Sequence, residues 1–315
     1  MPKVVRIGIV VAWIQAALGV VAVATGEPAL IPLCVLMVVA AIGIQRGNAS
    51  TAFGYALFQG AQVAVSAIVV SRAAGGLAAA QVASIGIALA VGILFVAVGL
   101  SLDGRDGVTR GMLPWLLASG CLVGSFACFE PFAIPTGAME DTILIGDKIL
   151  VQLFPRPSVQ RFDIVVIRYP IDHRQTFVKR VVGLPGDRLK LVNKQLVLNG
   201  KALTEPYALH KLEYLDSYRD NFPSDPNTPL FPPAVEMLDK NVANGEVVVP
   251  QGKYFVLGDN RDQSLDSRYW GFVSEVELIG KPVLVYGSRD RSTDDLVSGT
   301  LSFGRVRWSR IFKRL

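Results

Sequence analysis

The chain has 315 residues and a mean hydropathy of +0.42, which is more apolar than an ordinary soluble domain. Its formal net charge of +5 equals the five cations in the last eleven residues, so the remainder is close to neutral and nucleic-acid binding has no support. Cys34, Cys121 and Cys128 lie in apolar segments before residue 130, so the residues after 129 are predicted to have neither a disulfide framework nor a cysteine nucleophile. His173 and His210 form no metal-spaced motif, and no metal or other cofactor is predicted.

Charged side chains divide the chain between residues 129 and 130. Residues 1–129 hold nine of the 57 charged side chains, and residues 130–315 hold the other 48. The first part contains five apolar stretches, at 7–25, 29–45, 52–71, 77–102 and 111–129. A membrane-spanning helix needs about 20 apolar residues, which every stretch reaches except the short second one; that stretch contains Pro32 and has a re-entrant alternative. The pattern predicts an α-helical transmembrane bundle of about five spans over 1–129.

The orientation of this bundle follows from the cations near its ends. With five spans and the N-terminus inside, Arg72 is the only outer cation, and the inner side holds Lys3, Arg6, Arg46, Arg105 and Arg110. This distribution agrees with the positive-inside rule. The sequence therefore predicts a multi-pass protein of the plasma membrane with a cytoplasmic N-terminus and residues beyond 129 on the outer face, provided that the second stretch spans.

Residues 130–300 have the pattern of a mostly β domain. Short apolar runs rich in β-branched residues, at 148–153, 163–169, 176–182 and 253–257, alternate with turn residues. Asn199-Gly200 lies between two such runs and predicts a tight hairpin turn. Residues 216–236 are rich in Pro, Asp, Asn and Ser, which favours a surface loop or insertion.

Residues 301–315 form a basic amphipathic tail in which the cations alternate with Trp308 and Phe312. Such a mixture is typical of a helix that lies in the membrane interface, and this is the hypothesis for the tail. A solvated, disordered tail is the alternative.

Four segments of the domain carry unusual motifs: Ile134–Thr142 with Gly146-Asp147 after it, Arg161–Val166, Val178–Asp187 and Gly258–Gly271. In this order and spacing they resemble the conserved boxes of bacterial signal peptidase I. The resemblance covers roughly residues 129–285 and the basic C-terminus, and it leaves out the first four apolar stretches. Two departures stand out, since members of that family commonly have one or two membrane anchors and commonly have proline where this chain has Asp141.

The resemblance implies a serine/lysine dyad with Lys179 as the general base. A lysine with its ordinary pKa near 10.4 cannot accept a proton at neutral pH, so the dyad needs a base whose pKa is lowered by burial. Lys179 lies among valines on an expected strand, where Arg180 would point to the opposite face. A lysine on the surface of a strand is the alternative.

The resemblance also assigns supporting roles. Ser264 would orient Lys179, and Asp266 and Arg268 would brace the region, although a purely structural ion pair is the alternative for these two. The Thr136 hydroxyl and the backbone N–H of residue 138 would hold the oxyanion of a tetrahedral intermediate.

The nucleophile position departs from the family motif, because Ala138 stands where serine is expected. A methyl group cannot attack a carbonyl, so the covalent step is lost. Three explanations compete: an engineered serine-to-alanine change, a natural pseudopeptidase that binds without cutting, and a nucleophile shifted to Thr136 or Thr142. The last is disfavoured, because an error near 1 Å in the attacking atom already costs about a hundredfold.

The resemblance implies a serine endopeptidase that removes signal peptides from exported preproteins after small residues at positions −1 and −3. Preprotein signal peptides, membrane lipid and the secretion machinery are the implied partners. Phe132 and Ile134 would contact lipid or substrate, with burial in the core as the alternative. The second function class is a non-catalytic module that binds signal peptides or regulates the active enzyme. A self-cleaving repressor lacks support because no DNA-binding segment precedes the domain. A transporter lacks support because the spans contain no paired intramembrane charges.

Overall fold

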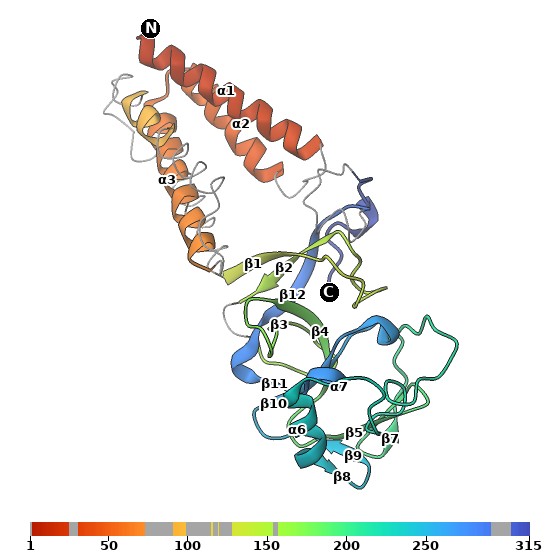
Figure 1. The fold of residues 1–315 in the computed structure, drawn as a ribbon. Helices are drawn as coiled ribbons and strands as arrows, with labels where there is room; N and C mark the ends of the chain where they lie inside the picture. The colour runs from red at the N-terminus through yellow and green to blue at the C-terminus, as the bar shows by residue number, and fades with distance from the viewer. Residues whose placement is uncertain are drawn as a thin grey trace. The chain divides into compact units, whose positions relative to one another are not determined.

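The computed structural model describes residues 2–24, 31–72, 91–98, 115, 119, 128–153, 157–290 and 304–315. The chain forms two compact units, Met1–Phe129 and Glu130–Leu315 (Figure 1). Each unit has its own hydrophobic core, so each is considered by itself.

The first unit is helical. Its helices are α1 (Lys3–Ala24), α2 (Ile31–Gln45) and α3 (Ala49–Arg72), and residues 91–98 are also helical. Tyr55 is fully buried, and its ring makes edge-to-face contacts with Phe95 at 4.8 Å and Trp115 at 5.7 Å. The Tyr55 hydroxyl donates a hydrogen bond of 2.7 Å to the side chain of Gln15, so its polar end is satisfied inside an apolar cluster.

The predicted membrane spans coincide only in part with the described residues. Three of the five stretches correspond to α1, α2 and α3, and 91–98 belongs to the fourth; the rest of the fourth and almost all of the fifth lie outside the described residues. Among the helices that the structure describes, none combines the length and the hydropathy needed to cross a membrane. The five-span topology and its orientation therefore stay predictions, whereas helices followed by a mostly β domain are confirmed.

The second unit is built on two antiparallel sheets (Figure 1). The seven-stranded sheet has the order β1 (Phe129–Ala133), β2 (Asp147–Gln152), β12 (Leu278–Ser288), β3 (Ile164–Arg168), β4 (Thr176–Gly183), β10 (Lys253–Leu257) and β11 (Val273–Ser274). The five-stranded sheet has the order β7 (Lys201–Ala202), β6 (Gln195–Leu198), β5 (Arg188–Val192), β9 (Glu246–Val248) and β8 (Val242–Ala243). The predicted turn joins β6 to β7, with Asn199 at φ 51° and Gly200 at φ 77°, both left-handed as a tight hairpin requires.

Strands β3 and β4 lie in the middle of the larger sheet and are covered on both faces. Ile164 and Val166 pack on one face against Ile134 and Met139. On the other face Val165 and Ile167 pack in a cluster that contains Trp270. The other buried members of this cluster are Tyr169, Val181, Val256, Val273 and Leu278. Burial on both faces explains why β3 is a continuous apolar run rather than an alternating one.

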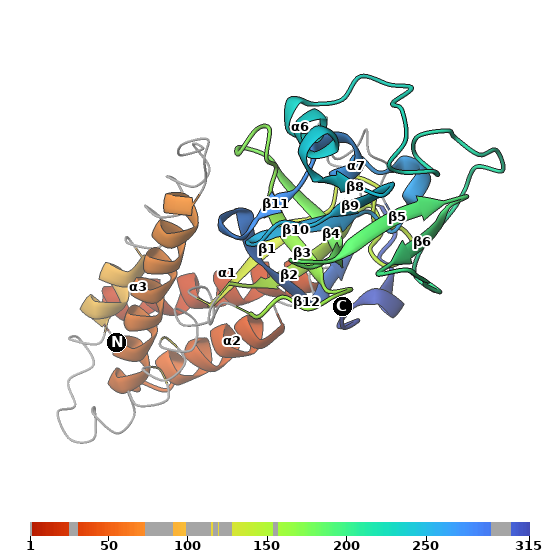
Figure 2. The ribbon, with the colours of Figure 1, turned by 90° about the horizontal axis from the view of Figure 1, so that it is seen from below.

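The surface-loop prediction for residues 216–236 is wrong for its first part. Tyr218 and Phe222 have exposed fractions of 0% and 1%, and both belong to the core cluster around the five-stranded sheet. The end of the segment enters helix α6 (Pro232–Asn241), which packs on β8, β9 and the short helix α7 (Ser267–Trp270) (Figure 2). The apolar ring of each buried residue outweighs the turn-rich composition around it.

The C-terminal tail differs from the predicted interfacial helix. Over the described residues 304–315 it contains one 3-10 turn, Trp308–Arg310, and no α-helix. The tail packs on its own unit instead, because Phe312 N–H donates to the carbonyl of Val285 at 2.7 Å and Leu315 packs on the cluster around Ile149. Trp308 and Phe312 remain largely exposed.

Candidate active site

Lys179 lies in the middle of β4, where it pairs with Val165 of β3. Its exposed fraction is 3%, so the alternative of a surface lysine is wrong. The Lys179 Nζ atom lies 5.4 Å from the centre of the Phe177 ring on the same face. The neighbouring Arg180 is also buried, and it forms a bidentate pair of 2.7 and 2.6 Å with Asp259.

Burial lowers the pKa of Lys179 to about 8, because the ammonium loses its water. The positive charge of Arg268 acts in the same direction, whereas Asp266 and Asp259 oppose it. A lysine with such a pKa is partly neutral near pH 7 and 8. The amine is therefore able to accept a proton, which an ordinary lysine does not do.

Asp266 and Arg268 form the predicted ion pair, with 2.8 Å between Arg268 Nη2 and Asp266 Oδ2 and no exposed side-chain surface on either. Asp266 also accepts the backbone N–H of Gly258 at 3.2 Å. Burial acts to raise the pKa of Asp266, but Arg268 and Lys179 hold it below its usual range. The carboxylate thus stays charged beside Lys179, and the ion pair fits both the bracing role and the purely structural alternative.

Ser264 is buried, and its Oγ has no hydrogen-bond partner among the described residues. The bond to Lys179 that the resemblance implies is not formed here. Gly258 packs closely against both Ser264 and Ala138. A Cβ placed on Gly258 would lie 2.2 Å from Ser264 Oγ and 2.6 Å from the Ala138 carbonyl oxygen. Glycine at 258 is therefore required for Ser264 and the Ala138 loop to approach each other.

Ala138 lies in a turn between β1 and β2 that is partly accessible to solvent. Asn260 holds this turn, because its backbone N–H donates to the Ala138 carbonyl and its Nδ2 donates to the Gly137 carbonyl, both at 3.1 Å. Asn260 was not predicted as a site residue. Its position inside the Gly-Asp-Asn-Arg-Asp motif was the only sequence signal, and the motif alone does not reveal what the amide binds.

The two threonines near Ala138 differ in their surroundings. Thr136 is exposed. The Thr142 hydroxyl donates to Asp259 Oδ2 at 2.5 Å and lies 3.4 Å from Nη2 of Arg180. A hydroxyl held in this way has its proton committed to a carboxylate that already pairs with an arginine, which further disfavours Thr142 as a nucleophile.

Ile134, which precedes the turn, is buried in the core cluster of β2, β3 and β12 with 5% exposed, and Phe132 packs partly buried against it. Burial is thus the correct alternative for Ile134. The second unit therefore contains a buried amine of lowered pKa, a buried ion pair beside it, and a turn around residue 138 that is held by Asn260.

The family model and the related proteins point to one protein family. A family model described as "Signal peptidase, peptidase S26" matches residues 109–287. Signal peptidase I of Buchnera aphidicola subsp. Acyrthosiphon pisum is 30% identical over 228 residues, covering 54% of this chain and 72% of that protein. Signal peptidase I of Pseudomonas aeruginosa is 32% identical over 211 residues, covering 56% and 70%. A crystal structure of a signal peptidase I from Enterococcus faecalis is 36% identical, with 40% of this chain and 97% of that chain covered and a TM-score of 0.28.

Proposed function

The chain belongs to the signal peptidase family, peptidase S26, and from this premise we propose that its site is that of a signal peptidase I-type serine endopeptidase whose cleavage is disabled by Ala138. The observation that carries the proposal is Lys179, a buried amine with a pKa of about 8 in the domain that holds Ala138. Burying an amine destabilises a fold, so a buried lysine flanked by the Asp266–Arg268 pair supports a catalytic role.

The chemistry follows from serine at position 138. The neutral amine of Lys179 takes the hydroxyl proton as the serine oxygen attacks the scissile carbonyl. The N–H of residue 138 and the Thr136 hydroxyl stabilise the oxyanion, and the Lys179 ammonium returns the proton to the leaving amine. Lys179 then removes a proton from the water that hydrolyses the ester. With Ala138 no bond to the acyl group forms, while binding is retained.

The substrates that we propose are preproteins whose signal peptides end in small residues at positions −1 and −3. The proposed location is the plasma membrane, with the helical unit as a multi-pass anchor, the N-terminus in the cytoplasm and the β domain on the outer face. The nine charges in residues 1–129 and their positive-inside distribution support this topology. Membrane lipid and the secretion machinery are the further partners.

A non-catalytic pseudopeptidase is the second candidate, and Ala138 itself favours it. Such a protein binds signal peptides, or regulates an active peptidase, without cutting. The two candidates differ in whether the rest of the site still works once the hydroxyl is supplied.

The test compares the full chain with its Ala138→Ser variant on a preprotein that has a small-x-small cleavage site, in detergent or liposomes. Lys179→Ala in the serine background is the control. Cleavage by the serine variant alone, lost again with Lys179→Ala, supports the disabled peptidase. A serine variant that binds preprotein but stays inert supports the pseudopeptidase, and cleavage by the Ala138 chain itself overturns the nucleophile assignment and makes Thr136 the next residue to test.

A further inference from the structure

The segment Glu205–Phe222 belongs to none of the four motifs, and it runs beside the Gly258–Gly271 motif, which follows β10. Leu209 N–H donates to the Asp259 carbonyl at 2.7 Å, and Arg261 N–H donates back to the Leu209 carbonyl at 2.9 Å. The Arg261 guanidinium, itself 1% exposed, pairs with Glu205 at 2.6 and 2.9 Å. The segment is therefore fastened to the motif over several residues rather than at one point.

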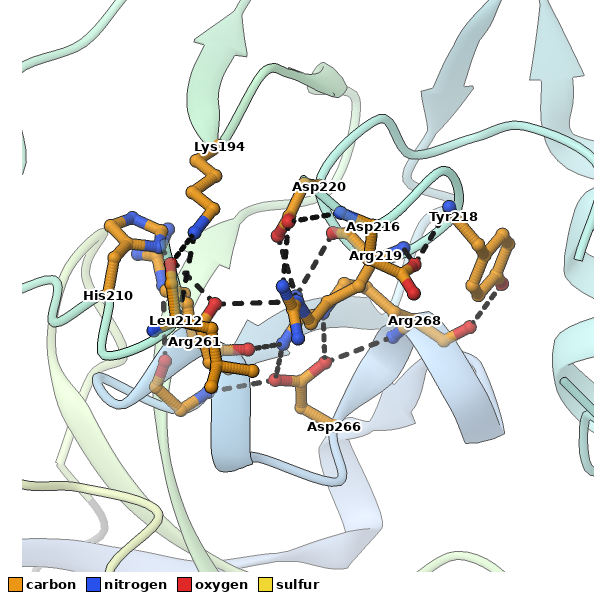
Figure 3. A network of polar contacts seen from close by, with 12 residues as sticks. Lys194, His210, Leu212, Asp216, Tyr218, Arg219, Asp220, Arg261, Asp266 and Arg268 are labelled. Carbon is orange, nitrogen blue, oxygen red and sulfur yellow. Dashed lines mark hydrogen bonds and ion pairs between the residues drawn. The ribbon is translucent and has the colours of Figure 1, made fainter. Parts of the chain in front are cut away.

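Asp262 forms the second set of contacts between this segment and the Gly258–Gly271 motif. Its side chain is fully buried and accepts the Leu212 N–H at 2.7 Å. Three basic side chains surround the carboxylate: Arg219 at 3.4 Å, His210 at 3.6 Å and Lys194 at 3.8 Å. Figure 3 shows Lys194, His210 and Arg219 directed to this region from different parts of the chain. A buried carboxylate needs such partners. Asp262 therefore connects the β5–β6 turn and the Glu205–Phe222 segment to the Gly258–Gly271 motif.

The segment reaches the braced ion pair directly (Figure 3). The Tyr218 hydroxyl donates to the Arg268 carbonyl at 2.5 Å, and Arg268 Nη1 donates to the Arg219 carbonyl at 3.1 Å. Arg268 Nε and Nη2 both donate to Asp266, and Nη2 also donates to the Arg261 carbonyl. A fully buried guanidinium keeps one geometry only while these acceptors stay in place.

We propose that Glu205–Phe222 is a positioning element of the general base, in which Tyr218 and the carbonyl of Arg219 fix Arg268, and Arg268 fixes Asp266 beside Lys179. This inference rests on the proposed function. Among the described residues, the charges that act on the Lys179 ammonium come from Asp266, Arg268 and Asp259. The tyrosine is thus a positioning residue that acts through the ion pair and does not touch substrate.

The direction of the effect follows from the charges. If Arg268 loses its fixed place, Lys179 loses a neighbouring cation, while the Asp266 carboxylate beside it is less well compensated. Both changes favour the ammonium and raise the pKa of Lys179. A rise of one unit lowers the neutral fraction about tenfold at pH values below the pKa.

The test uses Tyr218→Phe, which keeps the buried ring and removes only the hydroxyl. Ser224→Ala is the matched control, because the Ser224 hydroxyl donates to the Ser217 carbonyl at 2.8 Å within the same loop. In the Ala138→Ser chain, kcat/KM is measured against pH on a preprotein. In the chain with Ala138, the Lys179 side chain is titrated by NMR on carbon-13-labelled lysine, with Lys179→Ala to assign its signal.

We expect Tyr218→Phe to move both the rate profile and the Lys179 titration to higher pH, with a loss of about threefold or more at pH 6.5 that disappears above pH 9. The control should leave both unchanged. A rate lowered equally at all pH values, with an unmoved titration, overturns the proposal and leaves Tyr218 a merely structural residue. If the serine variant does not cut, the proposed function fails, but the titration still decides the positioning role.

Discussion

Lys179 and residue 138, the two positions between which the proton would pass, are held by different kinds of contact. Lys179 stands on a central strand, with a backbone ladder on both sides and apolar clusters over both faces. Residue 138 stands in a turn that is fixed by the backbone and amide of Asn260, which is 122 positions away in the sequence. The proposed base is thus positioned by secondary structure and burial, whereas the proposed nucleophile position also depends on polar bonds to a distant residue, one of which comes from a side chain that a single substitution can remove.

The largest expected effect is on the base. In the Ala138→Ser chain, Lys179→Ala should lower kcat by about 10²- to 10⁴-fold, because it removes the buried amine whose lowered pKa suits it to take the proton. Initial rates on a preprotein substrate measure this. A variant that keeps more than a tenth of the rate would assign the base to another residue.

The second effect is on stability and comes from the same lysine. Its pKa is about 8 in the fold and 10.5 in an exposed lysine, so between these values the unfolded chain binds more protons and stability rises with pH. Below pH 8 the destabilisation is fully present, at roughly 3 kcal/mol. Lys179→Met should therefore raise the free energy of unfolding at pH 7, and the gain should fade between pH 8 and 10.5.

Chemical unfolding at pH 7 and pH 10.5 tests this, with Lys201→Met as the matched control on an exposed strand position. A gain that is the same at both pH values would mean that packing, and not the buried charge, is responsible.

The third effect belongs to the turn. Asn260→Ala removes the bond from Nδ2 to the Gly137 carbonyl but keeps the backbone bond to residue 138. A turn displaced by a fraction of an ångström should lower kcat of the serine variant by about ten- to a hundredfold. The pH–rate profile should keep its position, because the charges around Lys179 are unchanged. A shifted profile would show that turn and base are not independent.

The smallest effect concerns the tail, which contacts the far end of the same turn. Arg310 pairs with Asp147 at 2.6 Å and donates to the Thr142 carbonyl at 2.9 Å. Arg310→Ala should lower kcat of the serine variant a fewfold and reduce the thermal midpoint by a few degrees, since it leaves the buried Asp147 with fewer partners. Arg314→Ala, at an exposed position, is the control. Equal effects of the two substitutions would mean that the contacts of Arg310 do not support the turn.

Some features could be read from the sequence because they are local. The alternating runs predict the β-rich domain, Asn199-Gly200 predicts its hairpin, and valines around Lys179 predict a buried strand lysine. The motif residues Lys179, Ser264, Asp266 and Arg268 fall in one domain, and the ion pair forms as expected. The absence of serine at 138 is likewise a property of the sequence.

Other features depend on residues far apart in the chain, and local pattern does not encode such contacts. Turn-rich composition around Tyr218 predicts a surface loop, yet its ring fills a core formed by β5, β6 and β9, and its hydroxyl binds Arg268, 50 positions later. The basic tail resembles an interfacial helix, yet Arg310 reaches Asp147 across 163 positions. Hydrophobic periodicity and motif spacing determine which residues form strands and boxes, but only the folded chain determines which buried polar group meets which partner, because that choice depends on desolvation at sites that several distant segments build together.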